Sequence, residues 1–331
     1  MPVPATRVRE PLRFQRIFLE KVWGGRALER TPGIELPGVR PIGETWEISD
    51  RKEHNSVVQG GAHAGRTLRE LMREHGREIL GRARAARDGT FPLLVKLLDA
   101  SEALSVQVHP HTSTAIAGED TKTESWYILA AKPGACVYLG LRPGVDREAF
   151  ARVAPTPAVV EMLARHEVKP GQFVFVPGGS VHAIGAGVTL VEVQENSDVT
   201  LRFYDWGRMG LDGKPRPVQV ADAVRATRFG MELAGPFEPR AQELERGHSR
   251  AKLADCAEFA VDLLELEREL ECDTADVALV YIAVSGRGRL KAGSDAWPIA
   301  PGDTWLVPAS VGRHRIEASP KLRLLQARTK A

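Results

Sequence analysis

The sequence predicts a mainly β fold made of two copies of one β-barrel unit, with a few helices. Short segments along most of the chain alternate between apolar and polar residues, which is the period of a half-buried strand. The segment 169–177, Lys-Pro-Gly-Gln-Phe-Val-Phe-Val-Pro, resembles the segment 300–308, Ala-Pro-Gly-Asp-Thr-Trp-Leu-Val-Pro. A histidine follows each copy, His182 after the first and His314 after the second. Such an internal echo indicates a repeated structural unit.

The composition limits the class of protein. The 331 residues fit one large or two closely joined domains, at about 100–200 residues per domain. The 45 basic and 43 acidic side chains nearly cancel, to a net charge of +2, so we expect no nucleic-acid partner. No apolar run approaches the roughly 20 residues that span a membrane, and the N-terminus lacks the apolar core of a signal peptide. The three widely spaced cysteines fit a reducing compartment, so we expect a cytoplasmic protein.

The first third of the chain predicts strands around one helix. The extended segment 11–25 and the alternating segment 43–49 are both typical of strands. Thr67 and Glu70 have the spacing of a capping box, so a helix is expected to run to about residue 80. Gly76 weakens the prediction of that helix because glycine has a low helix propensity.

The stretch 104–110, Leu-Ser-Val-Gln-Val-His-Pro, carries the most informative pattern. As a strand, it places Ser105, Gln107 and His109 on one face and two valines on the other. Buried amide and imidazole groups must be hydrogen-bonded or must ligate something. Two further polar residues accompany neighbouring strands, since Glu124 directly precedes the second strand and His182 follows the third. The oxygen and nitrogen donors of four residues therefore make a plausible ligand set for a divalent metal: Gln107, His109, Glu124 and His182.

The remaining elements follow the same alternation. Lys96 interrupts the apolar strand 91–99, so it either reaches the strand edge or faces a polar cavity. Residues 146–165 are expected to be helical with a break near Pro155 and Pro157, and the region 221–250 has no clear period. Strands are expected at residues 125–130, 137–140, 168–176, 189–194, 199–204, 259–266, 277–284, 288–291 and 304–307.

The spacing Gly171-x5-Pro177-x-Gly179-x2-His182 matches the second metal motif of cupins, which are small jelly-roll β-barrels. Together with Gln107-x-His109, it makes the chain resemble the type I mannose-6-phosphate isomerases. The resemblance covers residues 11–208, about two thirds of the chain, and its last segment is similar to the shorter bacterial members. The matching segments are Trp23-Gly24-Gly25, Gly43-Glu44, Val95 to Ala100, Leu104 to Pro110, Lys122 to Tyr127, Val181 to Ile184, Glu192 to Arg202, and Phe203 to Arg208.

This resemblance implies two cupin units and one metal site. Residues 1–220 would form a metal-bearing catalytic domain with helical segments, and residues 221–331 a second cupin-like domain without metal ligands. By the same resemblance, one zinc ion binds to Gln107, His109, Glu124 and His182. One carboxylate among three neutral ligands leaves the site net positive, which preserves Lewis acidity. The same donors also suit manganese, cobalt or iron.

The implied reaction interconverts mannose 6-phosphate and fructose 6-phosphate through a cis-enediolate, so the expected partner is a hexose phosphate. Arg202 suits stabilisation of the enediolate charge or grip of an anionic group, and its alternative is a surface salt bridge. Lys122 and Lys96 are candidates for phosphate contact or proton transfer. Glu192 and Asp198 are further acid/base candidates, although Asp198 equally suits a turn cap.

Three residues are expected to contact the substrate: Ser105, Lys96 and Trp23. Trp23 has an alternative, because an aromatic residue on a strand more often packs in the core than at the rim of a sugar site. His111 lies where the family more often has an acidic residue, and we expect it in a loop beyond Pro110 rather than in the ligand set.

Two other functions fit the same motifs. A cupin could bind a sugar phosphate without catalysis, which is favoured if Lys122, Glu192 and Arg202 do not converge. A metal-dependent oxygenase on the same barrel usually needs two histidines and a carboxylate, and Gln107 in place of a histidine makes that function less favoured. We expect the protein to be a monomer or homodimer.

Overall fold

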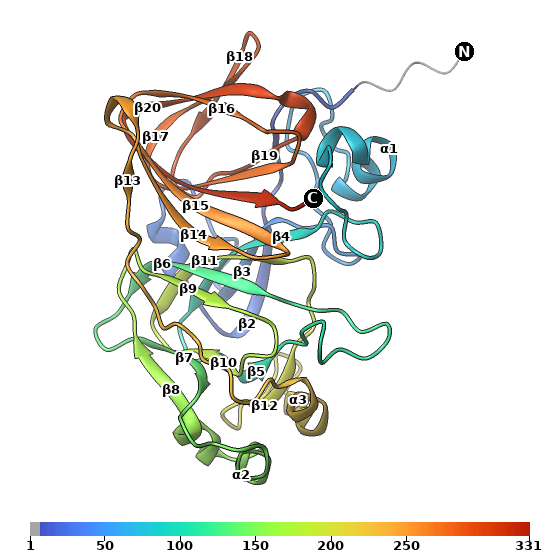
Figure 1. Ribbon diagram of the computed structural model, residues 1–331, viewed down its shortest axis with the longest axis vertical. Coiled ribbons are helices and arrows are strands. Elements are labelled where there is room, and N and C mark those ends of the chain that lie inside the picture. Colours follow the sequence, from blue (N-terminus) through green and yellow to red (C-terminus); the bar gives the residue numbers. More distant parts are fainter. Residues whose placement is uncertain (1–6) are drawn as a thin grey trace.

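The computed structural model describes residues 7–331, and these residues confirm a mainly β fold (Figure 1). They form sheets of nine, five and six strands. Within residues 7–331 the strand order of no sheet closes on itself, although β16 and β18 branch from the nine-stranded sheet. The expected closure into two jelly-roll units, divided near residue 220, therefore stays a prediction. No helix within this part of the chain is both long and apolar enough to cross a membrane.

The N-terminal two thirds of the chain builds the five- and six-stranded sheets. The strand order is β12-β5-β10-β7-β8 in the first and β2-β3-β4-β11-β6-β9 in the second. The elements are β1 (Leu12–Arg13), β2 (Ile17–Gly25), η1 (Ala27–Arg30), β3 (Ile42–Ile48), α1 (Leu68–Leu80), β4 (Leu93–Ala100), β5 (Val106–Val108), β6 (Glu124–Ala131), β7 (Cys136–Leu141), α2 (Arg147–Val153), η2 (Pro157–Met162), β8 (Leu163–Glu167), β9 (Phe173–Val176), β10 (His182–Ile184), β11 (Val188–Glu195), β12 (Leu201–Tyr204) and α3 (Val220–Ala226).

The C-terminal third builds the nine-stranded sheet. Its elements are β13 (Gln242–Glu243), η3 (Glu245–Gly247), β14 (Ser249–Asp255), β15 (Phe259–Leu266), β16 (Glu269–Asp273), β17 (Leu279–Ala292), β18 (Asp295–Ile299), β19 (Thr304–Val307), η4 (Ala309–Val311) and β20 (Arg313–Thr329). Strand β1 joins this sheet by pairing with β19, so residues 12–13 are part of the C-terminal sheet.

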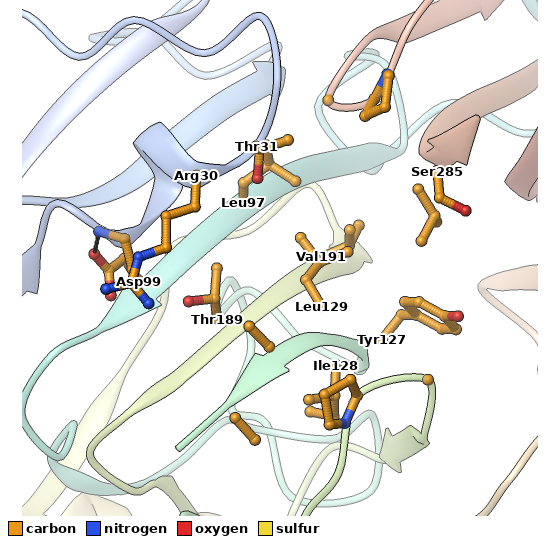
Figure 2. A pocket seen from close by; sticks show the side chains of 18 of the residues that line it. Arg30, Thr31, Leu97, Asp99, Tyr127, Ile128, Leu129, Thr189, Val191 and Ser285 are labelled. Atoms are coloured by element: carbon orange, nitrogen blue, oxygen red, sulfur yellow. Dashed lines mark hydrogen bonds between the residues drawn. The ribbon is translucent and has the colours of Figure 1, made fainter. Parts of the chain in front are cut away.

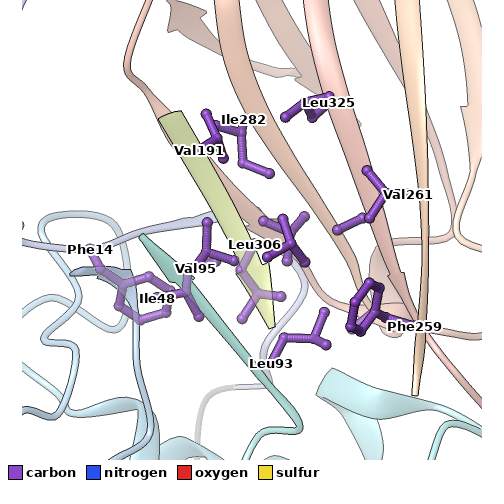
Figure 3. Packing of buried hydrophobic residues seen from close by; sticks show 14 of the residues in the cluster. Phe14, Ile48, Leu93, Val95, Val191, Phe259, Val261, Ile282, Leu306 and Leu325 are labelled. Atoms are coloured by element: carbon purple, nitrogen blue, oxygen red, sulfur yellow. The ribbon is translucent and has the colours of Figure 1, made fainter. Parts of the chain in front are cut away.

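The central strands of the six-stranded sheet are buried on both faces. Leu98, Ile128 and Leu190 point into the space enclosed with the five-stranded sheet. On the opposite face, Val95 and Val191 belong to the cluster that includes Ile282, Leu306 and Leu325 of the nine-stranded sheet (Figure 3). A strand covered on both sides needs apolar residues at consecutive positions, which explains why β4 reads as an almost continuous apolar run.

The first helix begins as the sequence predicts. Thr67 caps α1 by accepting a hydrogen bond from the backbone N–H of Glu70 at 3.2 Å, and the Glu70 carboxylate accepts one from the backbone N–H of Thr67 at 2.8 Å. The helix continues through Gly76 with a kink at His75. Its buried apolar face, which includes Leu71 and Ile79, supplies the stability that local propensity does not.

Several expected boundaries are wrong beyond residue 145. The expected strands 277–284 and 288–291 form one strand, β17, because register shifts beside Gly286 and Gly288 absorb the irregularity without ending the pairing. Residues 146–165 divide into α2, η2 and β8, and a helix, α3, lies at the border of the region without a clear period. Strands resume with the short β13 at Gln242, within the region without a clear period and before the expected strand 259–266.

Candidate metal centre

Two histidines and one glutamate meet between the five- and six-stranded sheets. His109 follows β5, His182 begins β10, and Glu124 begins β6 of the opposite sheet. The His109 Nε2 atom lies 3.3 Å from Glu124 Oε2, and the His182 Nε2 atom lies 3.4 Å from Glu124 Oε1. All three side chains are 1% exposed. The structure therefore brings together three of the four expected ligands from separate strands.

The orientation of His182 leaves its Nε2 free for a ligand. Its Nδ1 atom lies 2.9 Å from the backbone carbonyl oxygen of Ser180 and donates to it, which places the lone pair of the neutral ring on Nε2. Metal-binding histidines are commonly fixed by a second contact of this kind. The echo at His314 has the same local structure, with Nδ1 2.8 Å from the carbonyl oxygen of Gly312. In that copy the Tyr281 hydroxyl lies 2.8 Å from Nε2.

Gln107 is the fourth expected ligand and lies next to His182. The two residues are paired across β5 and β10, and Gln107 Nε2 lies 3.2 Å from His182 Nε2. The Ser105 hydroxyl donates a hydrogen bond of 2.9 Å to Gln107 Oε1. A hydroxyl can donate or accept, so Ser105 can hold the amide in either orientation, including the one that turns Oε1 toward a metal.

The donor set fits a divalent metal in spacing and in protonation. Donors about 2.0–2.1 Å from a tetrahedral zinc ion are about 3.3–3.4 Å apart, close to the distances found here. Burial and the charge of Lys122 lower the pKa of His109 to about 3, and burial also lowers the pKa of His182. The pKa of Glu124 lies well below its usual range, because the charge of Lys122 and contacts with the two histidines outweigh the effect of burial. At neutral pH the imidazoles are neutral and the carboxylate is charged, as ligation requires.

Lys122 contacts two of these donors. Its Nζ atom lies 2.6 Å from Glu124 Oε2 and 3.3 Å from His109 Nε2, and the residue is 4% exposed. Because the same carboxylate oxygen, Oε2, faces both this ammonium and His109, Lys122 is positioned beside whatever the donor set binds.

A row of four side chains crosses the six-stranded sheet beside the donor set. Trp46 of β3 pairs with Lys96 of β4, Lys96 with Glu192 of β11, and Glu192 with Trp126 of β6. The Lys96 Nζ atom lies 3.4 Å from Glu192 Oε2 and 5.1 Å from the centre of a Trp46 ring. Lys96 is 3% exposed, so it faces a polar interior and does not reach the strand edge. Burial and the nearby Glu124 charge raise the pKa of Glu192 to about 7.

Glu44 belongs to this site, although no role was expected for it. Its Oε2 atom accepts a 2.7 Å hydrogen bond from the indole of Trp46 and lies 3.8 Å from Lys96 Nζ. Two signals could have revealed it: its position in the matching segment Gly43-Glu44, and its place on the same strand face as Trp46. The contact between its carboxylate and Lys96 depends on the register of the strands, which neither signal provides.

Arg202 lies on the facing sheet. It pairs with Gln107 across β12 and β5, so the two side chains leave the same face of the five-stranded sheet. Its Nε atom is buried and has no hydrogen-bond partner among residues 7–331, and burial lowers the pKa of the guanidinium. A buried N–H without a partner is costly and is available to an anionic ligand. Asp198, in contrast, is exposed, and its acid/base role stays a prediction.

Within residues 7–331, no hydrogen bond or ion pair joins Trp23 or His111 to the donor set. Trp23 is 3% exposed and packs in the cluster of Leu98 and Trp126, which favours the core alternative over the sugar rim. His111 lies in a loop, where its Nδ1 is 2.8 Å from the Ser113 hydroxyl. The location expected for His111 therefore agrees with the structure.

Comparison with known proteins decides the family. The model of the type I phosphomannose isomerase catalytic domain matches residues 12–134, and that of the mannose-6-phosphate isomerase cupin domain matches residues 250–325. The mannose-6-phosphate isomerase ManA of Bacillus subtilis is 35% identical over 315 residues, which are 93% of this chain and 96% of the relative. The chain belongs to the type I phosphomannose isomerase family.

Two further relatives agree with this membership. The mannose-6-phosphate isomerase of Streptococcus mutans is 32% identical over 91% of this chain and 93% of its own length. The crystal structure of the mannose 6-phosphate isomerase from Bacillus subtilis superposes with a TM-score of 0.87 at 32% identity, covering 96% of this chain and 99% of that chain. The match to the cupin domain extends the resemblance into the C-terminal third, where the sequence motifs had shown only a strand pattern.

Proposed function

We propose that this protein interconverts mannose 6-phosphate and fructose 6-phosphate between its five- and six-stranded sheets. The observation that carries the proposal is the convergence of the buried donor set with a buried Lys96–Glu192 pair and with Lys122. Family membership supports this function over non-catalytic sugar-phosphate binding and over an oxygenase.

The proposed metal is zinc, held by Gln107, His109, Glu124 and His182. When bound, the ion would polarise the substrate oxygens at the reacting carbons and neutralise charge that develops on them. The donor chemistry and spacing described above support this ligand set, and the neutral histidines preserve the positive charge of the site.

Proton transfer between neighbouring carbons needs a group that can both take and return a proton beside the carbonyl. We assign this role to Glu192 or Lys122, which both lie next to Glu124. Trp126 holds one Glu192 oxygen and Lys96 faces the other, so the carboxylate has a fixed orientation. Arg202, with its unpartnered Nε, suits the enediolate charge or the substrate phosphate.

The decisive experiment measures conversion of mannose 6-phosphate to fructose 6-phosphate before and after chelation, with zinc added back. We expect chelation to abolish turnover and zinc to restore it. A matched variant, Glu192→Gln, should still bind zinc at one ion per chain but lose at least 100-fold in kcat. Zinc bound at one per chain without turnover by the unaltered protein would contradict the substrate assignment.

Three further expectations belong to this proposal: a cytoplasmic location, the absence of a nucleic-acid partner, and a monomeric or homodimeric state. Light scattering after size exclusion measures the last of these directly, since a trimer or larger assembly would exclude both expected states.

A further inference from the structure

A cavity of about 810 Å³ lies between the six-stranded sheet and the nine-stranded sheet (Figure 2). Leu97 and Val191 form part of its floor, and Ser285 and Gly302 reach it from the C-terminal sheet region. A volume of this size is typical of small-molecule sites. The cavity shares none of its lining residues with the donor set, so it is a separate compartment.

The floor of this cavity is the reverse side of the Lys96–Glu192 row. Leu97 pairs with Val191, and Val191 pairs with Tyr127. These three residues are the immediate chain neighbours of Lys96, Glu192 and Trp126. Successive side chains of a strand leave opposite faces of the sheet. A molecule in the cavity would therefore contact the same three strands that hold the active-site row, from behind.

One end of the cavity is cationic. Arg30 and Lys132 line it, both are exposed, and neither forms an ion pair within residues 7–331. Arg26 also lines this end, but its guanidinium is engaged with the backbone carbonyls of residues 36, 37 and 40 and with Glu29. Two unpaired cations at a cavity mouth attract an anionic group, and a guanidinium beside an ammonium suits phosphate.

Hydroxyl-binding groups continue from the cationic end into the cavity. Asp99 lies beside Arg30, and its Oδ2 already accepts a hydrogen bond of 2.5 Å from the backbone N–H of Ala27 (Figure 2). Thr189 lies further in, and the Tyr127 and Ser285 side chains occupy the other end. A carboxylate beside two cations disfavours a ligand that is anionic throughout, but it suits one that also carries donor hydroxyls.

We propose that this cavity is a second binding site, for a small phosphorylated polyol or sugar, separate from the metal centre. The phosphate would pair with Arg30 and Lys132, and the hydroxyl groups would bond to Asp99 and Thr189. The carbon skeleton would lie on Leu97 and Val191.

The test uses glucitol 6-phosphate, which has no carbonyl group and cannot be isomerised, titrated calorimetrically into the metal-loaded protein. The double variant Arg30→Ser/Lys132→Ser should lose one binding event, or bind at that site at least about 10-fold more weakly, since it removes two charge-assisted contacts. The control Arg152→Ser/Lys214→Ser removes the same charge from exposed residues outside the cavity and should bind as the unaltered protein does. Identical isotherms for all three proteins, or no binding to the unaltered protein at millimolar probe, would overturn the proposal.

Hydrogen exchange supplies a second readout that needs neither variant nor activity. The segments 27–32 and 283–285 contain lining residues of the cavity and no residue of the donor set or of the Lys96–Glu192 row. Saturating glucitol 6-phosphate should protect both segments. Protection confined to 105–109 and 122–124 would place the probe at the metal centre alone and contradict a second site. Neither readout depends on turnover, so failure of the proposed isomerase activity would leave this test intact.

Discussion

Trp126 and Glu192 lie opposite each other on β6 and β11, and the Trp126 indole donates a 3.1 Å hydrogen bond to Glu192 Oε1. The same ring lies 5.6 Å from that of His182, in an edge-to-face arrangement. One buried aromatic side chain therefore contacts both the proposed proton-transfer group and a proposed metal ligand. Trp126 therefore connects Glu192 of the six-stranded sheet with His182 of the five-stranded sheet.

Replacing Trp126 by phenylalanine separates these two contacts. The Trp126→Phe variant keeps an aromatic ring near His182 but removes the indole donor, so the Glu192 carboxylate loses one of its fixed partners. We expect kcat to fall about 10-fold, because a hydrogen bond to a charged group contributes about 1.5–3 kcal/mol. Zinc stoichiometry should be unchanged. Trp297→Phe on β18 is the control, and an equal loss of kcat in that variant would refute the assignment.

The ionised carboxylate of Glu44 stabilises the fold, so the free energy of unfolding should decrease as the pH becomes acidic. Burial works to raise the pKa of Glu44, but the charges of Lys96 and Lys21 and the Trp46 indole outweigh it and hold this pKa at about 2. The unfolded value is about 4.3, so the carboxylate stabilises the fold above that pH and loses this contribution as pH falls toward 2. The difference corresponds to about 3 kcal/mol.

The Glu44→Gln variant tests this contribution. Its free energy of unfolding in urea, compared with that of the unaltered protein, should differ most at pH 7, and the difference should shrink as pH falls to 3. Exposed Glu148→Gln provides the control, for which no such convergence is expected. A difference that is independent of pH would show that Glu44 is not held in its charged form.

Local patterns predicted much of the donor set. The alternation of 104–110 placed Gln107 and His109 on one strand face, and the cupin spacing added His182. The capping box at Thr67 identified the start of α1 because cap chemistry is local. These features depend on residues that are close together in the chain, so their geometry can be inferred without knowing the fold.

Other features depended on long-range pairing. The Lys96–Glu192 contact follows from the register of β4 against β11, across about a hundred residues of chain, which no local pattern specifies. Strand β20 was not expected because its first half is charged and contains Pro320, and regular apolar alternation starts only near Leu322. Its pairing with β15, β16 and β17 holds it extended despite that composition.

The Ser105 hydroxyl is hydrogen-bonded to the Gln107 side-chain amide. The Ser105→Ala variant removes the hydroxyl that contacts the Gln107 amide, so we expect metal affinity to fall about 10- to 100-fold, the usual effect of losing a group that orients a ligand. Competition with a chromophoric chelator measures this affinity. The Ser105→Thr variant keeps a hydroxyl and should recover most of it. If Ser105→Ala binds zinc normally, then Gln107 either is not a ligand or is held by other contacts.

Replacing Tyr281 tests whether His314, the second histidine of the repeat, has a structural role. The Tyr281 hydroxyl lies 2.8 Å from His314 Nε2 and accepts a 3.0 Å hydrogen bond from Gln326, and Tyr281 is 1% exposed. In Tyr281→Phe both neighbours lose a buried partner, at an expected cost of about 1–3 kcal/mol in the free energy of unfolding. The turnover of the folded protein should not change, because this network lies in the nine-stranded sheet, away from the donor set. A fall in turnover with unchanged stability would contradict the structural role. It would show that the C-terminal sheet takes part in the reaction.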